Sequence, residues 1–133
     1  MLALRARPHA QLRKISMSKL VYIAGPYSSE DRKQKRANIE AAINAALWCA
    51  RNRIYYFCPH MNSAYFDDLA PDVPATFYHD MDIRIAWTCD GLLLLPGWEE
   101  SRGALGEYSF FTQGNKPVFY WPNDLGIILK WSE

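Results

Sequence analysis

The stretch from Gly97 to Glu107 holds residue types that enzymes often use for chemistry. It follows a continuous apolar run, Leu92–Leu95, that is typical of a buried strand, and it leads into a segment typical of a helix. A strand therefore ends, a Gly-rich turn follows, and a helix begins that carries one carboxylate, Glu107, two turns in. Because ligands of open α/β sheets bind at the carboxyl ends of strands, this carboxylate is a candidate nucleophile.

Small and hydroxyl-bearing residues precede Glu107. Gly103 and Ala104 leave the backbone open to a ligand, and Ser101 stands where the helix is expected to begin. The unpaired N–H groups of a helix N-terminus suit an anion such as a phosphate. A solvated helix acid is the ordinary alternative for an isolated Glu, but the surrounding small residues favour a site.

Two further carboxylates, Asp80 and Asp82, lie in the next helix upstream, expected over residues 75–88. One of them near Glu107 could divide with it the roles of acid and nucleophile. A polar helix face is the alternative for both. Asp90 directly precedes a strand, so we expect it at the opposite end of the sheet, as a turn residue without a catalytic role.

The turn after the first strand carries Gly25, Tyr27 and Ser28. Its backbone N–H groups, phenol and hydroxyl could hold a sugar or a phosphate. Several basic side chains lie just beyond this turn, and Arg32 is the best candidate among them to bind a phosphate. Lys33 and Lys35 are expected on a solvated helix face.

Three other side chains are weaker candidates. His60 follows the second strand and could hydrogen-bond a base or another side chain. Trp98 could stack on a base, although core packing is the commoner role of an aromatic residue. His79 is expected on a helix surface. One His without Cys or His partners is weak support for a metal, and no metal or organic cofactor is implied.

Apolar patterns and turn residues predict strands that alternate with helices. The strands are expected at 19–24, 54–58, 91–95 and 117–121, and the helices at 30–52, 75–88, 101–113 and 123–131. The fold class is therefore α/β: a single doubly wound three-layer domain, Rossmann- or flavodoxin-like, with a mostly parallel sheet of four or five strands. The turns at 25–29, 59–65 and 96–103 all follow strands and should share one edge.

Composition excludes several classes of protein. The chain has 133 residues, which fits one domain, and a net charge of +1, which gives no case for polymeric nucleic acid or a membrane surface as partner. Its three cysteines form no C-x-x-C pair and suit a reducing compartment, so we expect a cytoplasmic protein. No apolar run approaches the ~20 residues that span a bilayer.

The first 16 residues differ from the rest, because they carry four Lys or Arg and no acid. They lack the apolar centre of a secretory signal and are short for an organellar transit peptide. We expect residues 1–16 to be a dispensable basic extension and residues 17–133 to form the domain, since Met17-Ser18-Lys19 is typical of a start before a first strand.

The Gly-rich turn matches neither the P-loop nor the dinucleotide-binding motif, and the chain lacks G-x-S-x-G. Taken together, residues 19–121 resemble the nucleoside 2-deoxyribosyltransferase superfamily. The resemblance is carried by Val21–Ser28, by Asp82 eight residues before Asp90-Gly91, and by the Ser101-x-Gly103-Ala104-x-x-Glu107 spacing. It implies that Glu107 is the nucleophile, that Asp82 binds the sugar or protonates the leaving base, and that Tyr27 lines the pocket.

Ser101 distinguishes branches of that superfamily. Transferases that act on free nucleosides usually have an Asp there. A Ser at this position instead resembles the branch of nucleoside 5′-monophosphate N-glycosidases and of small uncharacterised bacterial and phage relatives. The expected function is therefore hydrolysis of the N-glycosidic bond of a nucleoside 5′-monophosphate through a glycosyl-enzyme. The alternatives are a 2-deoxyribosyltransferase on free deoxynucleosides and a non-catalytic nucleotide-binding module. The resemblance also implies a small-molecule partner and a homodimer or higher homo-oligomer.

Overall fold

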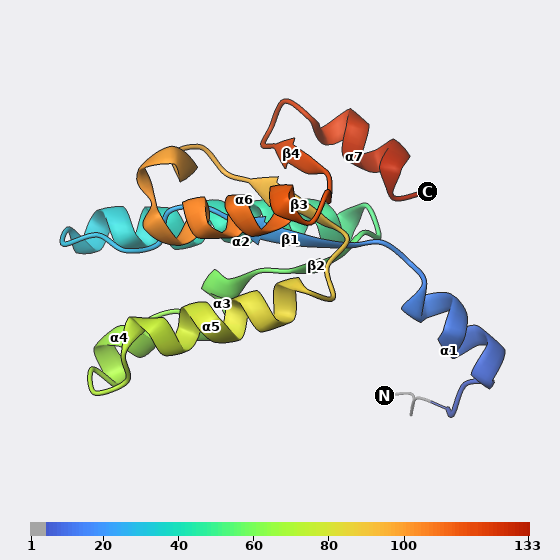
Figure 1. The fold of residues 1–133 in the computed structure, drawn as a ribbon, viewed down its shortest axis with the longest axis horizontal. Coiled ribbons are helices and arrows are strands. Elements are labelled where there is room, and N and C mark those ends of the chain that lie inside the picture. Colours follow the sequence, from blue (N-terminus) through green and yellow to red (C-terminus); the bar gives the residue numbers. More distant parts are fainter. Residues whose placement is uncertain (1–4) are drawn as a thin grey trace.

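A computed structural model describes residues 5–133 of the chain as a parallel sheet covered by helices on both faces (Figure 1). The strands are β1 (Leu20–Ala24), β2 (Tyr55–Phe57), β3 (Gly91–Leu94) and β4 (Val118–Tyr120). The helices are α1 (His9–Ser16), α2 (Arg32–Arg51), α3 (Pro59–Ser63), α4 (Phe66–Leu69), α5 (Ala75–Ala86), the 3-10 turn η1 (Trp98–Glu100), α6 (Arg102–Gln113) and α7 (Leu125–Trp131).

The strand order is β2-β1-β3-β4, and all three pairings are parallel. The first crossover runs to one side of β1 and the next to the other, so the sheet is doubly wound, with helices on both faces. The α/β three-layer prediction is confirmed, with four strands. The segments 25–29, 59–65 and 96–103 therefore leave the same edge of the sheet, the carboxyl edge, although residues 59–63 form α3 where a loop was expected.

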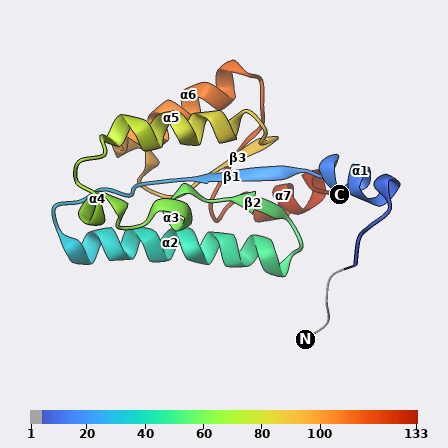
Figure 2. The same ribbon diagram turned by 90° about the horizontal axis from the view of Figure 1, so that it is seen from below.

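Alternate residues of β1 face the two helical layers, because successive side chains of a strand point to opposite faces. Val21 and Ile23 join a core cluster with helices α2 and α7, whereas Tyr22 and Ala24 join one with α5 and α6. Figure 2 shows the same division, with α5 and α6 on one side of the sheet and α2 on the other. This alternation directs Tyr22 toward the layer that carries Glu107.

Helix α1 was not expected from the sequence. It buries none of its residues, and it projects away from the sheet (Figure 1). Of the extension at 1–16, residues 1–4 lie outside the described residues. That the extension is dispensable stays a prediction.

Gly25 directly follows β1, at a point where the chain passes very close to Leu95, the residue after β3. A Cβ added to Gly25 would lie 2.7 Å from Leu95 Cβ, closer than side chains approach. We therefore expect Gly25→Ala to lower the free energy of unfolding by about 2 kcal/mol, because overpacking a core forces the backbone to move. Urea unfolding measures this.

Gly126 in α7 is the matched control, because a Cβ there would meet no atom within 4 Å. Gly126→Ala is expected to be neutral or to stabilise by up to about 1 kcal/mol, through helix propensity alone. Equal effects of the two substitutions would show that the contact with Leu95 does not restrict position 25.

Candidate active site

Glu107 is buried in the layer between the sheet and helices α5 and α6. Glu107 is 7% exposed, and the hydroxyl of Tyr22 in β1 donates a hydrogen bond to Glu107 Oε2. Ser101 caps the helix on which Glu107 stands, so the helix begins at a fixed residue and directs Glu107 inward in its second turn. A carboxyl group so far from water is costly to ionise, which is a common property of catalytic acids and nucleophiles.

Asp82 of α5 approaches the same region. Helices α5 and α6 pack closely, since a Cβ added at Gly106 would lie 3.1 Å from the ring of His79. His79 is thus half-buried, with its ring against α6. Asp82 lies one helical turn beyond His79, on the same face of α5. Its Oδ1 is buried and has no hydrogen-bond partner among the described residues.

The two carboxyl groups have raised pKa values. Burial is the largest cause for Glu107, whose pKa rises to about 8; the Tyr22 hydrogen bond opposes the rise and the charge of Asp82 adds to it. Burial alone raises the pKa of Asp82 to about 6. Burial therefore favours the protonated form of each carboxyl group, and most strongly that of Glu107. Two carboxyl groups whose environments separate their pKa values can exchange the roles of acid and base.

Tyr22 is a site residue that the sequence analysis missed. It is fully buried, and burial together with the charge of Glu107 raises the pKa of its phenol, so the hydroxyl keeps its proton and remains a donor. A signal for it does exist in the sequence. A tyrosine in the middle of an apolar buried strand needs a partner for its hydroxyl, and a polar residue on the facing helix is the natural one.

The first turn of the carboxyl edge is tied to the α3–α4 region. The Tyr27 hydroxyl donates to Asp67 Oδ1 at 2.8 Å and accepts from the Tyr65 N–H at 2.8 Å, so its proton is engaged within the protein. Lys35 donates to Asp67 Oδ2 at 2.6 Å and is 6% exposed. The expectation that Lys35 lies on a solvated helix face is therefore wrong, because its ammonium group reaches back to a segment distant in sequence.

His60 begins α3 beside this turn. Its Nε2–H donates to the Pro26 carbonyl at 2.8 Å, and burial lowers the pKa of the ring, so the imidazole is neutral with Nδ1 as an acceptor. That Nδ1 is buried and has no partner in the part of the chain that the structure describes. An unpaired buried acceptor beside the carboxyl edge is suited to a donor group of a ligand.

Half-buried Ser101 and exposed Gly103 form a corner at the start of α6. Ser101 Oγ accepts from the Ala104 N–H at 3.2 Å, which leaves its own proton free to donate to an anion. A Cβ added at Gly103 would meet only Ser101 Oγ, at 4.0 Å, so the backbone there is open. Ala104 is 1% exposed and packs inward. Trp98 is half-buried, with its ring centroid 4.8 Å from that of Tyr108.

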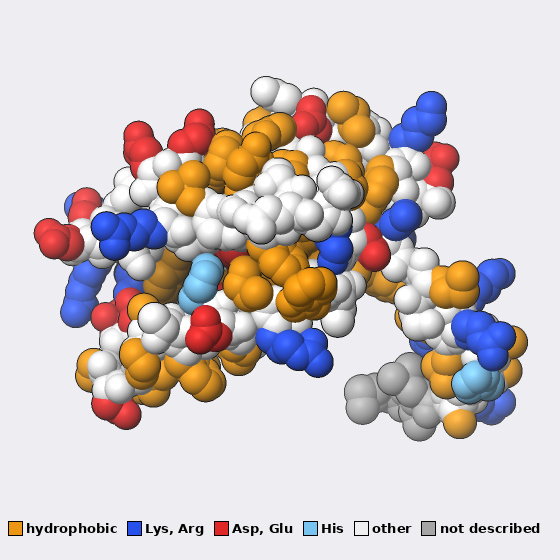
Figure 3. All heavy atoms as spheres, viewed as in Figure 1, with side chains coloured by type: hydrophobic (Ala, Val, Ile, Leu, Met, Phe, Trp, Pro, Cys, Tyr) orange, Lys and Arg blue, Asp and Glu red, His pale blue; other side chains and the backbone are white. Residues whose placement is uncertain are grey.

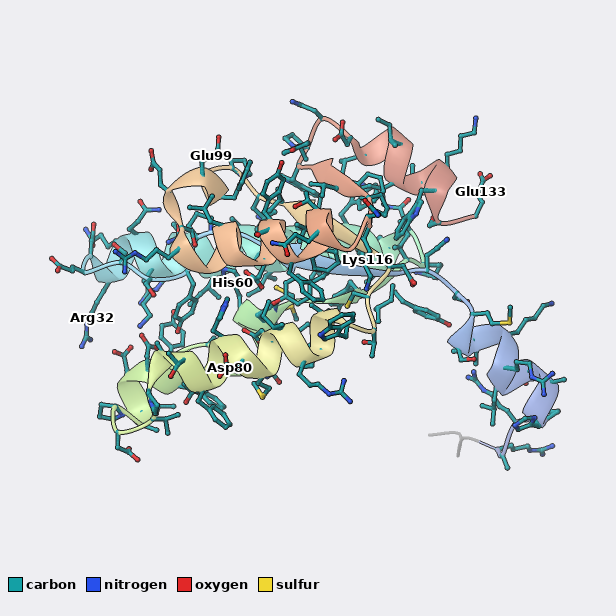
Figure 4. The ribbon with its side chains drawn as sticks, viewed as in Figure 1. Arg32, His60, Asp80, Glu99, Lys116 and Glu133 are labelled. Carbon is teal, nitrogen blue, oxygen red and sulfur yellow. The ribbon has the colours of Figure 1, made fainter. Side chains whose placement is uncertain are left out.

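The other sequence candidates make no contact with the carboxyl pair in the described residues. Ser28 is exposed, and Arg32 is exposed at the start of α2, where Figure 4 shows it pointing away from the body. Asp80 is exposed on α5. Asp90 Oδ2 accepts from the Leu20 N–H at 2.8 Å, so it fastens the opposite end of the sheet, as expected. Roles of Ser28 and Arg32 in binding stay predictions.

Residues 5–133 contain neither a cluster suited to a metal ion nor a helix suited to a membrane. In that range no group of three or more His, Cys, Asp or Glu side chains could hold a metal ion. Helices long and apolar enough to cross a membrane are also absent from that range. In the view of Figure 3, charged side chains lie mainly around the rim of the molecule, and apolar side chains are exposed nearer its centre.

Comparisons with known proteins give a family and a fold. A family model described as a domain of unknown function (DUF4406) matches residues 19–120. Among solved structures, a 2-desoxiribosyltransferase from Leishmania mexicana matches with a TM-score of 0.53 and 18% identity, over 77% of this chain and 63% of its own. This chain thus spans less than two thirds of that protein. No curated protein sequence matches. The resemblance noted from the sequence is confirmed at the level of the fold.

Proposed function

Since the chain belongs to the DUF4406 family, whose description assigns no function, we propose from the chemistry of its site that it breaks the N-glycosidic bond of a nucleoside or nucleotide. The observation that carries this proposal is the pair of Glu107 and Asp82, whose carboxyl groups both have pKa values raised by burial, with the Tyr22 hydroxyl bonded to Glu107. Retaining cleavage of a glycosidic bond needs two such carboxyl groups, one as nucleophile and one as acid.

The proposed reaction has two steps. In the first, Glu107 attacks C1′ of the sugar in its ionised form, and the C1′–N bond breaks as its electrons pass to the base, which takes a proton from Asp82. In the second, water or another base attacks C1′, releases Glu107, and returns a proton to Asp82. Positive charge at C1′ in each transition state favours the ionised form of Glu107, and the Tyr22 hydrogen bond holds that carboxylate in place.

The acceptor in the second step decides between two activities. Transfer of a 2-deoxyribosyl group to a second base is the leading proposal, because the solved structure of the same fold is described as a 2-desoxiribosyltransferase. Hydrolysis of a nucleoside 5′-monophosphate is the second candidate. It is favoured by the corner at Ser101 and Gly103, where a free hydroxyl proton and open backbone at the start of a 12-residue helix suit a phosphate.

A product assay tests the proposal and separates the two activities. The purified protein is incubated with ribo- and deoxyribonucleosides and their 5′-monophosphates, each with and without a second free base, and bases and nucleosides are separated by chromatography. We expect a new nucleoside from a deoxynucleoside and a second base. If free base appears only from the 5′-monophosphates, the activity is hydrolysis and the transfer proposal is wrong. Binding without any product, seen as a ligand-dependent rise in Tm, would overturn catalysis and leave a nucleotide-binding module.

A further inference from the structure

Residues 5–16, which contain α1, form a segment that we call the arm. The arm carries four Lys or Arg and no acid. Leu12 and Ile15 lie three residues apart and therefore share one face of α1, whereas Arg13 and Lys14 lie on its other faces. Leu12 is 47% exposed, and α1 buries none of its residues. The arm is thus a basic amphipathic helix whose apolar face is left in water, as in helices that bind a groove on another surface.

An open apolar hollow of about 700 Å³ lies between α4 and the N-terminal half of α5. Most of its lining is apolar, and Phe66, Phe77, Tyr78 and Met81 are among the residues that form it. Phe66 is 45% and Phe77 54% exposed, so large aromatic side chains face water there. An open hollow with exposed aromatic side chains suits the apolar face of a helix better than a small molecule, which binds in an enclosed site.

The surface around the hollow is acidic. Residues 54–83 include five Asp and neither Lys nor Arg. Asp72 lines the hollow, Asp80 lies on α5 beside it, and both are exposed. Lys35 pairs with the two aspartates of α4, which leaves these charges together negative. Figure 3 shows apolar and acidic side chains together over α4 and α5, and apolar and basic ones together over α1. The arm and the hollow are therefore complementary in both charge and apolar surface.

The arm cannot lie in the hollow of its own chain. Figures 1 and 2 both place α1 and α4 at opposite ends of the molecule. Three residues join α1 to β1, and fully extended they place Ser16 no more than about 14 Å from Leu20. The strand itself rises about 13 Å toward the carboxyl edge. The whole linker is used up along β1, so α1 would have no length left to turn its side into the hollow.

We propose that the arm of one copy of this chain binds in the hollow of a second copy, and that two copies form a homodimer by exchanging their arms. The apolar face that includes Leu12 packs against Phe66 and Phe77, and the basic side chains face the acidic rim. A two-fold axis forms this contact twice, so two short arms close the dimer. Because α1 adds nothing to the core of its own chain, the exchange leaves each fold unchanged.

Sedimentation of the full chain over a range of concentrations measures the association. We expect the wild type to dimerise, with a dissociation constant that rises with salt, because salt screens the charges at the rim. Leu12→Asp in the arm and Phe77→Asp in the hollow should each raise that constant about 10-fold or more, as loss of a central apolar anchor does. Ile127→Asp is the matched control, at an exposed apolar residue of α7, and should match the wild type.

A mixture of two variants separates arm exchange from dimers of any other kind. Leu12→Asp keeps an intact hollow and Phe77→Asp keeps an intact arm, so the two together should form a heterodimer through one native contact. That heterodimer should be tighter than the dimer of either variant alone. If circular dichroism shows that Phe77→Asp does not fold, Asp72→Lys takes its place, because Asp72 is an exposed residue of a loop.

Three results would overturn the proposal: a wild type that stays monomeric, a dimer that Leu12→Asp leaves intact, or a mixture no tighter than its components. Vesicles that contain phosphatidylserine test the arm against an anionic lipid surface. A monomeric wild type that binds them, and a Leu12→Asp variant that does not, would assign the arm to lipid instead. Association requires no substrate, so the outcome does not depend on the proposed function.

Discussion

Replacing Glu107 with Gln is expected to abolish turnover, lowering kcat on the order of 10⁴-fold or more, as loss of a nucleophile does in other enzymes. The amide cannot form the glycosyl-enzyme, yet it fits the same space and its oxygen can still accept from Tyr22. The fold should therefore persist. Base release is measured by chromatography on the substrate that the product assay identifies, with far-ultraviolet circular dichroism as the measure of folding.

Glu100→Gln is the matched control for this substitution, because Glu100 is an exposed acid in η1, two residues before α6 begins. It should leave kcat unchanged. Intact mass after rapid quenching provides an independent measurement: the wild type should carry a glycosyl group and Glu107→Gln should not. Residual turnover in Glu107→Gln within 10-fold of the wild type would assign the nucleophile to another residue, Asp82 first.

The second large effect concerns stability against pH. The pKa of Glu107 rises in the folded protein from an ordinary 4.5 to about 8, so the folded state binds this proton more tightly than the unfolded chain does. Its contribution to stability is therefore fully present below pH 4.5 and is lost as pH rises through 8. The free energy of unfolding of the wild type should fall by about 4 kcal/mol between those limits. Asp82, with a pKa raised to about 6, acts in the same direction.

Urea unfolding at several pH values between 4.5 and 8.5 measures this loss. Glu107→Gln removes the titrating group, so its stability should depend less on pH, and near pH 8.5 the inactive variant should be the more stable protein. Glu100→Gln should follow the wild type throughout. A wild type whose stability changes no more than that of Glu107→Gln would show that Glu107 ionises in the fold without the burial cost described here.

Both expectations follow from one property of the site. A carboxyl group beneath α5 and α6 costs stability when it ionises, and an apolar residue of the same size would not. Natural proteins accept such costs at functional sites more often than elsewhere. The neighbouring groups fit that view, because Asp82 Oδ1 and His60 Nδ1 are buried polar atoms that find no partner within residues 5–133. A ligand with donor groups would satisfy both.

The sequence was sufficient for the architecture of this protein. Apolar runs bounded by Gly and Pro alternate with helical patterns, and this order permits few arrangements other than a parallel, doubly wound sheet. The carboxyl edge followed from that arrangement, since every strand of a parallel sheet ends on one side. Glu107 and Asp82 could be assigned to neighbouring positions on the same grounds, from their places on the helices beside β3.

The contacts of individual side chains were decided only by the tertiary structure. Tyr22 resembles an ordinary core residue until the helix opposite β1 is known, and Lys35 has the same local pattern as the exposed Lys33. Periodicity along one element tells which face a residue occupies, but not what packs against that face. The partners of Lys35 lie 32 and 33 residues away in α4, a helix of four residues that carries little apolar pattern. Burial and pairing across such separations depend on how the whole chain packs, and they determine which polar groups are free to bind a ligand.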